Sequence, residues 1–158
     1  MSDFPADREL VLDRVLKAPR QAVWRCWTEG ELLKQWFAPK PLKTPVAELD
    51  VRPGGKSLIV MELPDGNRMP NPGLYLEVVP GEKLIFTDAF ANAWDPKDAE
   101  PLMVATLTFA DEGEGLTRYI ARVRHWTRAA TQHHEEMGFH AGWGVCADQL
   151  EALAASLS

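Results

Sequence analysis

The chain lacks the features of several broad classes of protein. None of its apolar runs approaches the roughly 18 residues that a membrane-spanning helix needs. Residues 1–8 are polar and do not contain the apolar stretch of a secretory signal. Acidic residues outnumber basic ones by 23 to 17, for a net charge of −6, whereas binding to nucleic acid needs a basic face. We therefore expect a cytoplasmic protein whose partners include neither membranes nor nucleic acids.

Cysteine is scarce, and the motifs of common catalytic sites are missing. Cys26 and Cys146 are the only cysteines, and without an export signal we expect both to be reduced. There is no Cys-x-x-Cys pair, serine nucleophile elbow or glycine-rich phosphate loop. Residues 53–55, Pro-Gly-Gly, are interpreted as a turn, because no helix follows whose N-terminus could hold a phosphate. We expect no cofactor and no bound metal.

Turn signals divide the chain into elements. A strand over 9–16 precedes two short helices, one beginning near Pro19 and one at a capping box of Thr28 and Glu31. Pro-Gly and Asp-Gly turns then separate six strands, which tight connections force to pair antiparallel. The expected strands cover residues 46–51, 57–63, 73–79, 84–90, 102–109 and 116–126.

One long helix is predicted from Thr131 to Ser158. An apolar stripe recurs along it at spacings of four and three; it consists of Phe139, Trp143, Cys146, Leu150, Leu153 and Leu157. Continued towards the N-terminus, this face meets Gln132 and Glu136, flanked by His133 and His140. The helix also holds Gly138, Gly142 and Gly144, each unfavourable by about 1 kcal/mol relative to alanine, which indicates close backbone approach or empty volume beside it. We infer an α+β fold in which this helix covers one face of the sheet.

Several segments, in this order, resemble the signatures of one family. They are residues 18–24 (APRQAVW), 50–55 (DVRPGG), 73–80 (GLYLEVVP) and 137–140 (MGFH), followed by Gly142-Trp143. The chain resembles bacterial single-domain proteins similar to the C-terminal domain of the activator of Hsp90 ATPase, within the START/Bet v 1-like (SRPBCC) helix-grip superfamily. The resemblance implies a curved antiparallel sheet of six to seven strands around a long C-terminal helix, with an internal cavity. It implies a single domain over residues 8–157, after a short polar tail of residues 1–7.

The cavity wall can be predicted from strand alternation and from the six tryptophans, which in a small domain often line a cavity. On the last strand, Tyr119 and His125 belong to the set expected to face the helix, while the arginines at 118, 122 and 124 form a solvated face. The predicted ligand-binding residues are Trp36, Trp94, Met103, Tyr119, His125, Glu136, Phe139, His140 and Trp143. The alternative is that these side chains fill a solid core, with Tyr119 and His125 hydrogen-bonded to each other or to backbone.

Two constellations could carry chemistry. His133, Glu136 and His140 share one helical face at i, i+3 and i+7, and such side chains can bind zinc or iron. They would span about 10 Å, too far for one ion, so a polar, exposed helix start is favoured over a metal site. His125 and Glu136 are the candidates for a general acid–base pair.

Three functions follow, in order of preference. The first is binding of a small apolar or amphipathic molecule without turnover. The second is an enzyme of the cyclase, dehydratase or hydrolase type that uses the same cavity. The third is a chaperone cofactor; because the eukaryotic co-chaperone has a separate N-terminal domain and this chain begins with the helix-grip strand, we do not expect an Hsp90 interaction. Two questions are left open: whether the chain forms a weak homodimer, and whether residues 67–73, with the prolines at 64, 70 and 72, act as a lid over the cavity.

Overall fold

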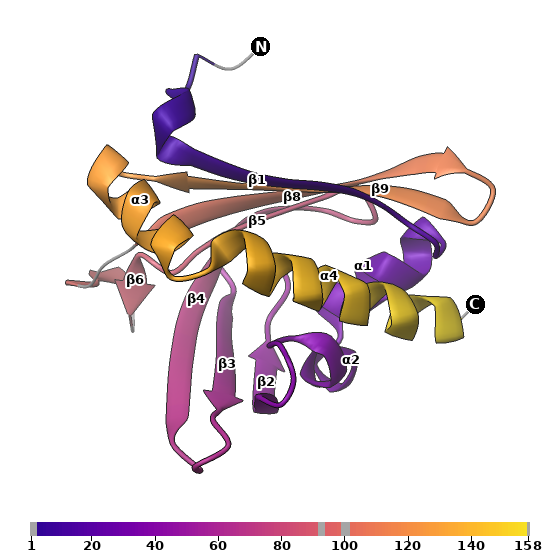
Figure 1. Ribbon diagram of the computed structural model, residues 1–158, viewed down its shortest axis with the longest axis horizontal. Coiled ribbons are helices and arrows are strands. Elements are labelled where there is room, and N and C mark those ends of the chain that lie inside the picture. The colour runs from indigo at the N-terminus through magenta and orange to yellow at the C-terminus, as the bar shows by residue number, and fades with distance from the viewer. Residues whose placement is uncertain (1–2, 92–93, 99–101, 158) are drawn as a thin grey trace.

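The computed structural model describes residues 3–91, 94–98 and 102–157, and its centre is a seven-stranded antiparallel sheet (Figure 1). The strand order is β1-β9-β8-β5-β4-β3-β2. The strands are β1 (Glu9–Leu16), β2 (Lys43–Leu49), β3 (Lys56–Glu62), β4 (Arg68–Val79), β5 (Lys83–Thr87), β8 (Met103–Gly113) and β9 (Leu116–His125). A small ribbon pairs β6 (Phe90–Ala91) with β7 (Asp95–Pro96).

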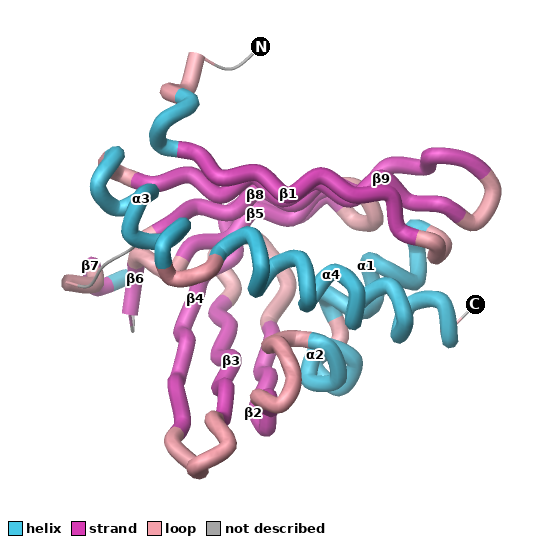
Figure 2. The backbone as a smooth tube through the Cα atoms, in the orientation of Figure 1, coloured by secondary structure: helices cyan, strands magenta, loops and turns pink. Residues whose placement is uncertain are grey.

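The helices lie where they can cover the sheet. They are η1 (Ala6–Arg8), α1 (Arg20–Thr28), α2 (Gly30–Trp36), α3 (Arg128–Glu136) and α4 (Phe139–Ser156). Figures 1 and 2 show β2, β3 and β4 running at a steep angle to β1 and β9, so that the sheet bends around α4. Helix α4 contacts α1, α2 and β1. The predicted α+β helix-grip fold is confirmed, with two short helices after the first strand. No helix within the described ranges is both long enough and apolar enough to cross a membrane.

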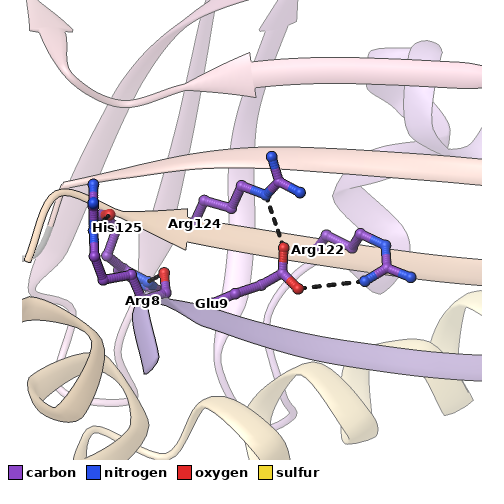
Figure 3. A network of polar contacts seen from close by, with 5 residues as sticks. All are labelled: Arg8, Glu9, Arg122, Arg124 and His125. Carbon is purple, nitrogen blue, oxygen red and sulfur yellow. Dashed lines mark hydrogen bonds and ion pairs between the residues drawn. The ribbon is translucent and has the colours of Figure 1, made fainter. Parts of the chain in front are cut away.

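The β8–β9 hairpin shows the predicted alternation of faces. Tyr119, Ala121, Val123 and His125 are each at most 2% exposed, whereas the arginines between them lie on the outer face. Arg118 pairs with Asp13 of β1 at 2.7 Å. The Glu9 carboxylate lies between Arg122 and Arg124, at 3.3 and 2.7 Å (Figure 3). The arginines therefore form a solvated face, tied to the neighbouring strand by cross-strand ion pairs.

The single long helix predicted from Thr131 is wrong, because the chain forms two helices. Gly138 has a φ of +97°, a left-handed conformation that ends α3 and restarts the chain as α4. Helix α3 begins earlier than predicted, since the Thr127 side chain caps it by accepting a hydrogen bond from the Ala130 N–H. The apolar stripe of α4 is confirmed, as all six of its residues are buried or half-buried. Its continuation to Gln132 and Glu136 fails, since both are exposed.

Two local predictions near the first helices also fail. The capping box is absent: Glu29 occupies the N-cap of α2, and the Thr28 hydroxyl instead donates to the carbonyl of Trp24 at 2.8 Å. Strand β2 begins at Lys43 and includes Pro45, within a register irregularity between Lys43 and Val46. An edge strand such as β2 tolerates proline, because one side of its backbone needs no partner strand.

Strand β4 is longer than predicted. It begins at Arg68, so residues 68–73, part of the segment considered as a lid, pair with β3 as strand. On the other side, β5 joins β4 only from Leu74 onwards, and no other described strand pairs with residues 68–73. The prolines at 70 and 72 therefore lie on a stretch of strand that pairs, among the described strands, with β3 alone.

Candidate functional site

A cavity of about 480 Å³ lies between the sheet and the helices. Its size is within the range of small-molecule sites. The wall is formed by residues from α1 and α2, from strands β3, β4, β5, β8 and β9, and from α3 and α4. Most of the lining is apolar and aromatic, including Trp27, Leu33, Trp36, Phe86, Met103 and Trp143.

Aromatic contacts fix one side of the cavity. The Trp27 ring packs edge-on against Trp36 with their centroids 4.8 Å apart, and lies 5.8 Å from Phe86. The Trp36 indole N–H donates to the carbonyl of Cys26 at 2.9 Å, which ties α2 to α1. A wall of rings held in this way is rigid, and it offers a flat apolar surface to a bound molecule.

The phenol of Tyr119 lies at the same wall. Burial raises the pKa of Tyr119 well above its ordinary value, and the nearby indole N–H of Trp27 opposes that shift only partly. Trp27 Nε1 is fully buried, and its interaction with the phenol oxygen falls short of full hydrogen-bond geometry. Tyr119 is therefore protonated at neutral pH and can act as a donor.

A pair of histidines forms part of another side of the site. Nδ1 of His125 lies 3.3 Å from the carbonyl oxygen of Arg8, and Nε2 of His125 lies 2.8 Å from Nδ1 of His134. The Arg8 guanidinium donates to the His125 carbonyl at 3.1 Å, and Figure 3 shows Arg8 beside His125. Burial lowers the pKa of both rings, that of His134 to about 4, so both are neutral at pH 7.

The Arg8 carbonyl determines the tautomer of both rings. A carbonyl can only accept, so Nδ1 of His125 carries the proton, and its Nε2 then accepts from Nδ1 of His134. The second nitrogen of His134, Nε2, is left as an unprotonated acceptor on a residue that lines the cavity.

A carboxylate and an ammonium group complete this polar region. Asp88 and Lys97 both line the cavity. Burial raises the pKa of Asp88, against the effects of the Met103 N–H, of Lys97 and of His125. The hydrogen bond from the Met103 N–H to the Asp88 carboxylate is 2.9 Å long. The cavity thus combines an aromatic wall with a polar region, the make-up of a site for an amphipathic molecule.

The structure brings some of the predicted site residues together and leaves others apart. Trp36, Met103, Tyr119 and Trp143 line the cavity. His125 and Phe139 are 1% and 2% exposed and lie behind that lining, where Phe139 packs against His134 and Trp143. Trp94, Glu136 and His140 are exposed and are not part of the wall. Glu136 points away because the helix that was expected to carry it inward breaks at Gly138, whereas His140 lies on α4 beside the inward stripe rather than on it.

The two predicted chemical constellations are not assembled. His133, Glu136 and His140 are all exposed, and His140 pairs with Glu135 at 2.9 Å. Within the described ranges, no group of three or more histidine, cysteine or acidic side chains is placed to hold a metal ion. The ring nitrogens of His125 face Arg8 and His134 rather than Glu136, so the proposed acid–base pair does not form.

The sequence reasoning missed Trp27, Asp88, Lys97 and His134. No site residue was predicted on the first helix, which holds Trp27, and Asp88 and Lys97 each follow a short strand. His134 could have been found from Thr127: a threonine N-cap there begins the helix earlier, and Gly138 ends it. The inward residues of that shorter helix are Ala130, Thr131 and His134.

Comparison with known proteins places the chain in a family. The model of the family described as "Activator of Hsp90 ATPase homolog 1-like protein" matches residues 17–155. A comparison with curated proteins gave no match.

Solved structures of bacterial proteins are similar over nearly the whole chain. A protein from Nitrosomonas europaea is 43% identical, with a TM-score of 0.90 over 98% of each chain. A protein from Chromobacterium violaceum is 29% identical, with a TM-score of 0.75 over 94% of this chain and 97% of that one. A protein from Staphylococcus epidermidis is 26% identical, with a TM-score of 0.81 over 100% and 96%. The chain therefore belongs to the activator of Hsp90 ATPase homolog 1-like family, with a Bet v 1-like helix-grip fold.

Proposed function

We propose that the protein binds a small apolar or amphipathic molecule in the cavity between the sheet and the helices. The observation that carries this proposal is the cavity itself: about 480 Å³ of space, walled by aromatic side chains, in a domain of 158 residues. Protein interiors are otherwise close-packed, with few voids larger than a water molecule. An apolar space of this size is favourable to fill, at about 25 cal/mol for each Å² of apolar surface removed from water.

The distribution of side chains suggests how the molecule lies. Its apolar body packs against the rings of Trp27, Trp36 and Trp143, all of which line the cavity. Its polar group lies nearer Asp88 and His134, where a carboxylate and an unprotonated imidazole nitrogen are available. A polar group placed there would give the Nε2 atom of His134 a donor, and would give the Asp88 carboxylate one in addition to the Met103 N–H.

Binding without turnover is favoured over catalysis. The acid–base pair expected of an enzyme, His125 with Glu136, is not assembled, because the ring nitrogens of His125 face Arg8 and His134 while Glu136 is exposed. We also propose a reducing, cytoplasmic setting, which is supported by the free thiols of Cys26 and Cys146.

The proposal is tested by native mass spectrometry of the protein purified from cell extract, followed by denaturation to identify what is released. A small molecule retained by the wild type is expected to be lost in Trp143→Leu, which removes part of the aromatic wall. The matched control is Trp126→Leu, since Trp126 is 53% exposed and lies outside the lining. Equal retention by Trp143→Leu and the wild type would contradict binding in this cavity.

A further inference from the structure

A chain of hydrogen bonds ends at an unpaired acceptor in the wall of the cavity. The Arg8 carbonyl accepts from Nδ1 of His125, and Nε2 of His125 accepts from Nδ1 of His134. Each bond fixes the direction of the next, because a neutral imidazole has one donor and one acceptor nitrogen. Nε2 of His134 is therefore an acceptor, and no residue that the structure describes donates to it.

The Nε2 atom of His134 is accessible to a bound molecule. It is not among the fully buried side-chain atoms that lack a partner in the described ranges, so it keeps accessible surface. The Nδ1 edge of the ring faces His125, and the ring also packs against Phe139; these two side chains are 1% and 2% exposed and lie behind the lining. Since His134 itself lines the cavity, the edge that carries Nε2 is the part left to meet that space.

We propose that Nε2 of His134 accepts a hydrogen bond from an uncharged N–H or O–H group of the bound molecule. The ligand class is then an apolar molecule with a neutral hydrogen-bond donor, such as an aryl carboxamide or an aryl alcohol. This inference rests on the proposed function, because it names the chemistry of the molecule that fills the cavity.

The choice of a neutral donor follows from this acceptor and the charges near it. Burial lowers the pKa of His134 to about 4, so Nε2 carries no proton at neutral pH. Ketones, ethers and carboxylates have no proton to donate and would leave it unpaired. A charged head group of either sign would also meet a like charge, because Asp88 and Lys97 both line the cavity.

Three probes of nearly the same shape separate donors from acceptors. The head group of 2-naphthamide is C(=O)NH₂. In 2-acetylnaphthalene a methyl group replaces the NH₂ and the carbonyl is kept, and in 2-isopropenylnaphthalene =CH₂ replaces the carbonyl oxygen as well. Only the amide can donate to Nε2 of His134. Dissociation constants are measured by calorimetry at pH 7, and the amide-to-ketone affinity ratio reports the donor, because the two probes differ only in that group.

Two variants separate the acceptor from the histidine pair. His134→Phe removes both ring nitrogens. In His134→Asn the side-chain amide reaches the position of Nδ1 but not that of Nε2, so it can still donate to His125 while the acceptor is lost. The matched control is His133→Asn, the same substitution at the neighbouring position of α3, where the side chain is exposed and outside the lining.

We expect the amide-to-ketone ratio to fall roughly three- to tenfold in both His134 variants, the worth of one hydrogen bond, and to be unchanged in His133→Asn. A spectroscopic readout accompanies it. In long-range ¹H–¹⁵N spectra of the imidazole rings, the Nε2 resonance of His134 is expected to have the shift of an unprotonated nitrogen, and to move upfield with 2-naphthamide and not with 2-acetylnaphthalene.

The outcomes separate this inference from the proposal on which it rests. If the probes bind but the amide-to-ketone ratio is the same in the wild type and both His134 variants, the acceptor role of Nε2 is refuted and the cavity proposal stands. A ratio that falls in His134→Phe but not in His134→Asn also refutes it, because the loss then comes from breaking the histidine pair. An equal fall in His133→Asn refutes it as well. If none of the three probes binds the wild type, the cavity proposal fails and this inference fails with it.

Discussion

Gly142 allows the cavity to be tested by one substitution in α4. It lies in the helix, where glycine is less stable than alanine by about 0.5–1 kcal/mol, and it lines the cavity. A Cβ placed on it meets no atom within 4 Å, so Gly142→Ala adds a methyl group without a clash. We expect the free energy of unfolding to rise by about 0.5 kcal/mol. This is the lower end of that range, because the residue lies near the start of the helix.

The assay is urea unfolding at 25 °C, in which the midpoint is expected to rise with an unchanged m-value. Two other glycines of the same segment are the controls. Gly138→Ala is expected to be destabilising by about 1–2 kcal/mol, because a φ of +97° is unfavourable for alanine even in open space. Gly144→Ala places its Cβ 2.9 Å from Nη2 of Arg14, so the guanidinium must move and the helical gain is offset.

A larger side chain at Gly142 tests occupancy of the cavity. Gly142→Leu extends an apolar side chain into the space that the ligand is proposed to fill, so we expect a folded protein that no longer binds 2-isopropenylnaphthalene. A destabilising effect of Gly142→Ala similar to that of Gly138→Ala would show that the space beside Gly142 is not empty. Undiminished probe binding by Gly142→Leu would show that the probe binds elsewhere.

Three further predictions concern the helix cap, pH and the thiols. Thr127→Ala removes the hydrogen bond to the Ala130 N–H and should lower the free energy of unfolding by about 1 kcal/mol in urea titrations; no change would contradict the cap. The pKa of His134 is about 4 in the folded protein, below its ordinary value of 6.5, because the ring is buried. The unfolded chain therefore binds the extra proton first, and stability falls as pH is lowered from 6.5 towards 4. His134→Phe should flatten that loss in unfolding curves measured across this range, and an unchanged slope would refute it. Cys146 lines the cavity, whereas Cys26 is fully buried and has a pKa raised to about 11. A thiol reagent should therefore modify Cys146 before Cys26, and a bound probe should slow the modification of Cys146. Faster modification of Cys26 would contradict this order.

Local periodicity was sufficient to predict the faces of the strands. Successive side chains of a strand point to opposite sides, so two polar residues at an even spacing share a face. Tyr119 and His125 were predicted to face inward on this basis, and both are almost fully buried. The spacing of four and three along α4 was equally informative, because it follows from 3.6 residues per turn.

The sequence was less informative about where a helix ends. The intrinsic helix propensity of glycine is the same at every position, so it cannot explain why Gly142 and Gly144 are helical whereas Gly138 is left-handed. The difference arises from tertiary packing: after the break, Phe139 contacts both His134 and Trp143, with ring centroids 5.3 Å apart in each pair. Since the break rotates α3 relative to α4, it also decides which polar side chain of α3 faces inward.

The remaining site residues depend on contacts between distant segments. Trp27 and Tyr119 meet because α1 packs beneath the sheet, and no local pattern in either segment indicates the other. His125 is positioned by the Arg8 carbonyl, a backbone atom that carries no sequence signal at all. Such pairings are fixed by the closure of the whole fold, so sequence reasoning could predict an aromatic cavity but not its hydrogen-bonding groups.

The most direct test of ligand binding in the cavity uses the tryptophans as reporters. Trp27, Trp36 and Trp143 line it, whereas Trp94 and Trp126 are both 53% exposed and do not. In a ¹H–¹⁵N spectrum of the indole N–H groups, titration with 2-isopropenylnaphthalene is predicted to shift the three cavity signals in a saturable manner and to leave the two exposed ones unchanged. Unchanged cavity signals, or shifts confined to Trp94 and Trp126, would contradict a ligand site between the sheet and the helices.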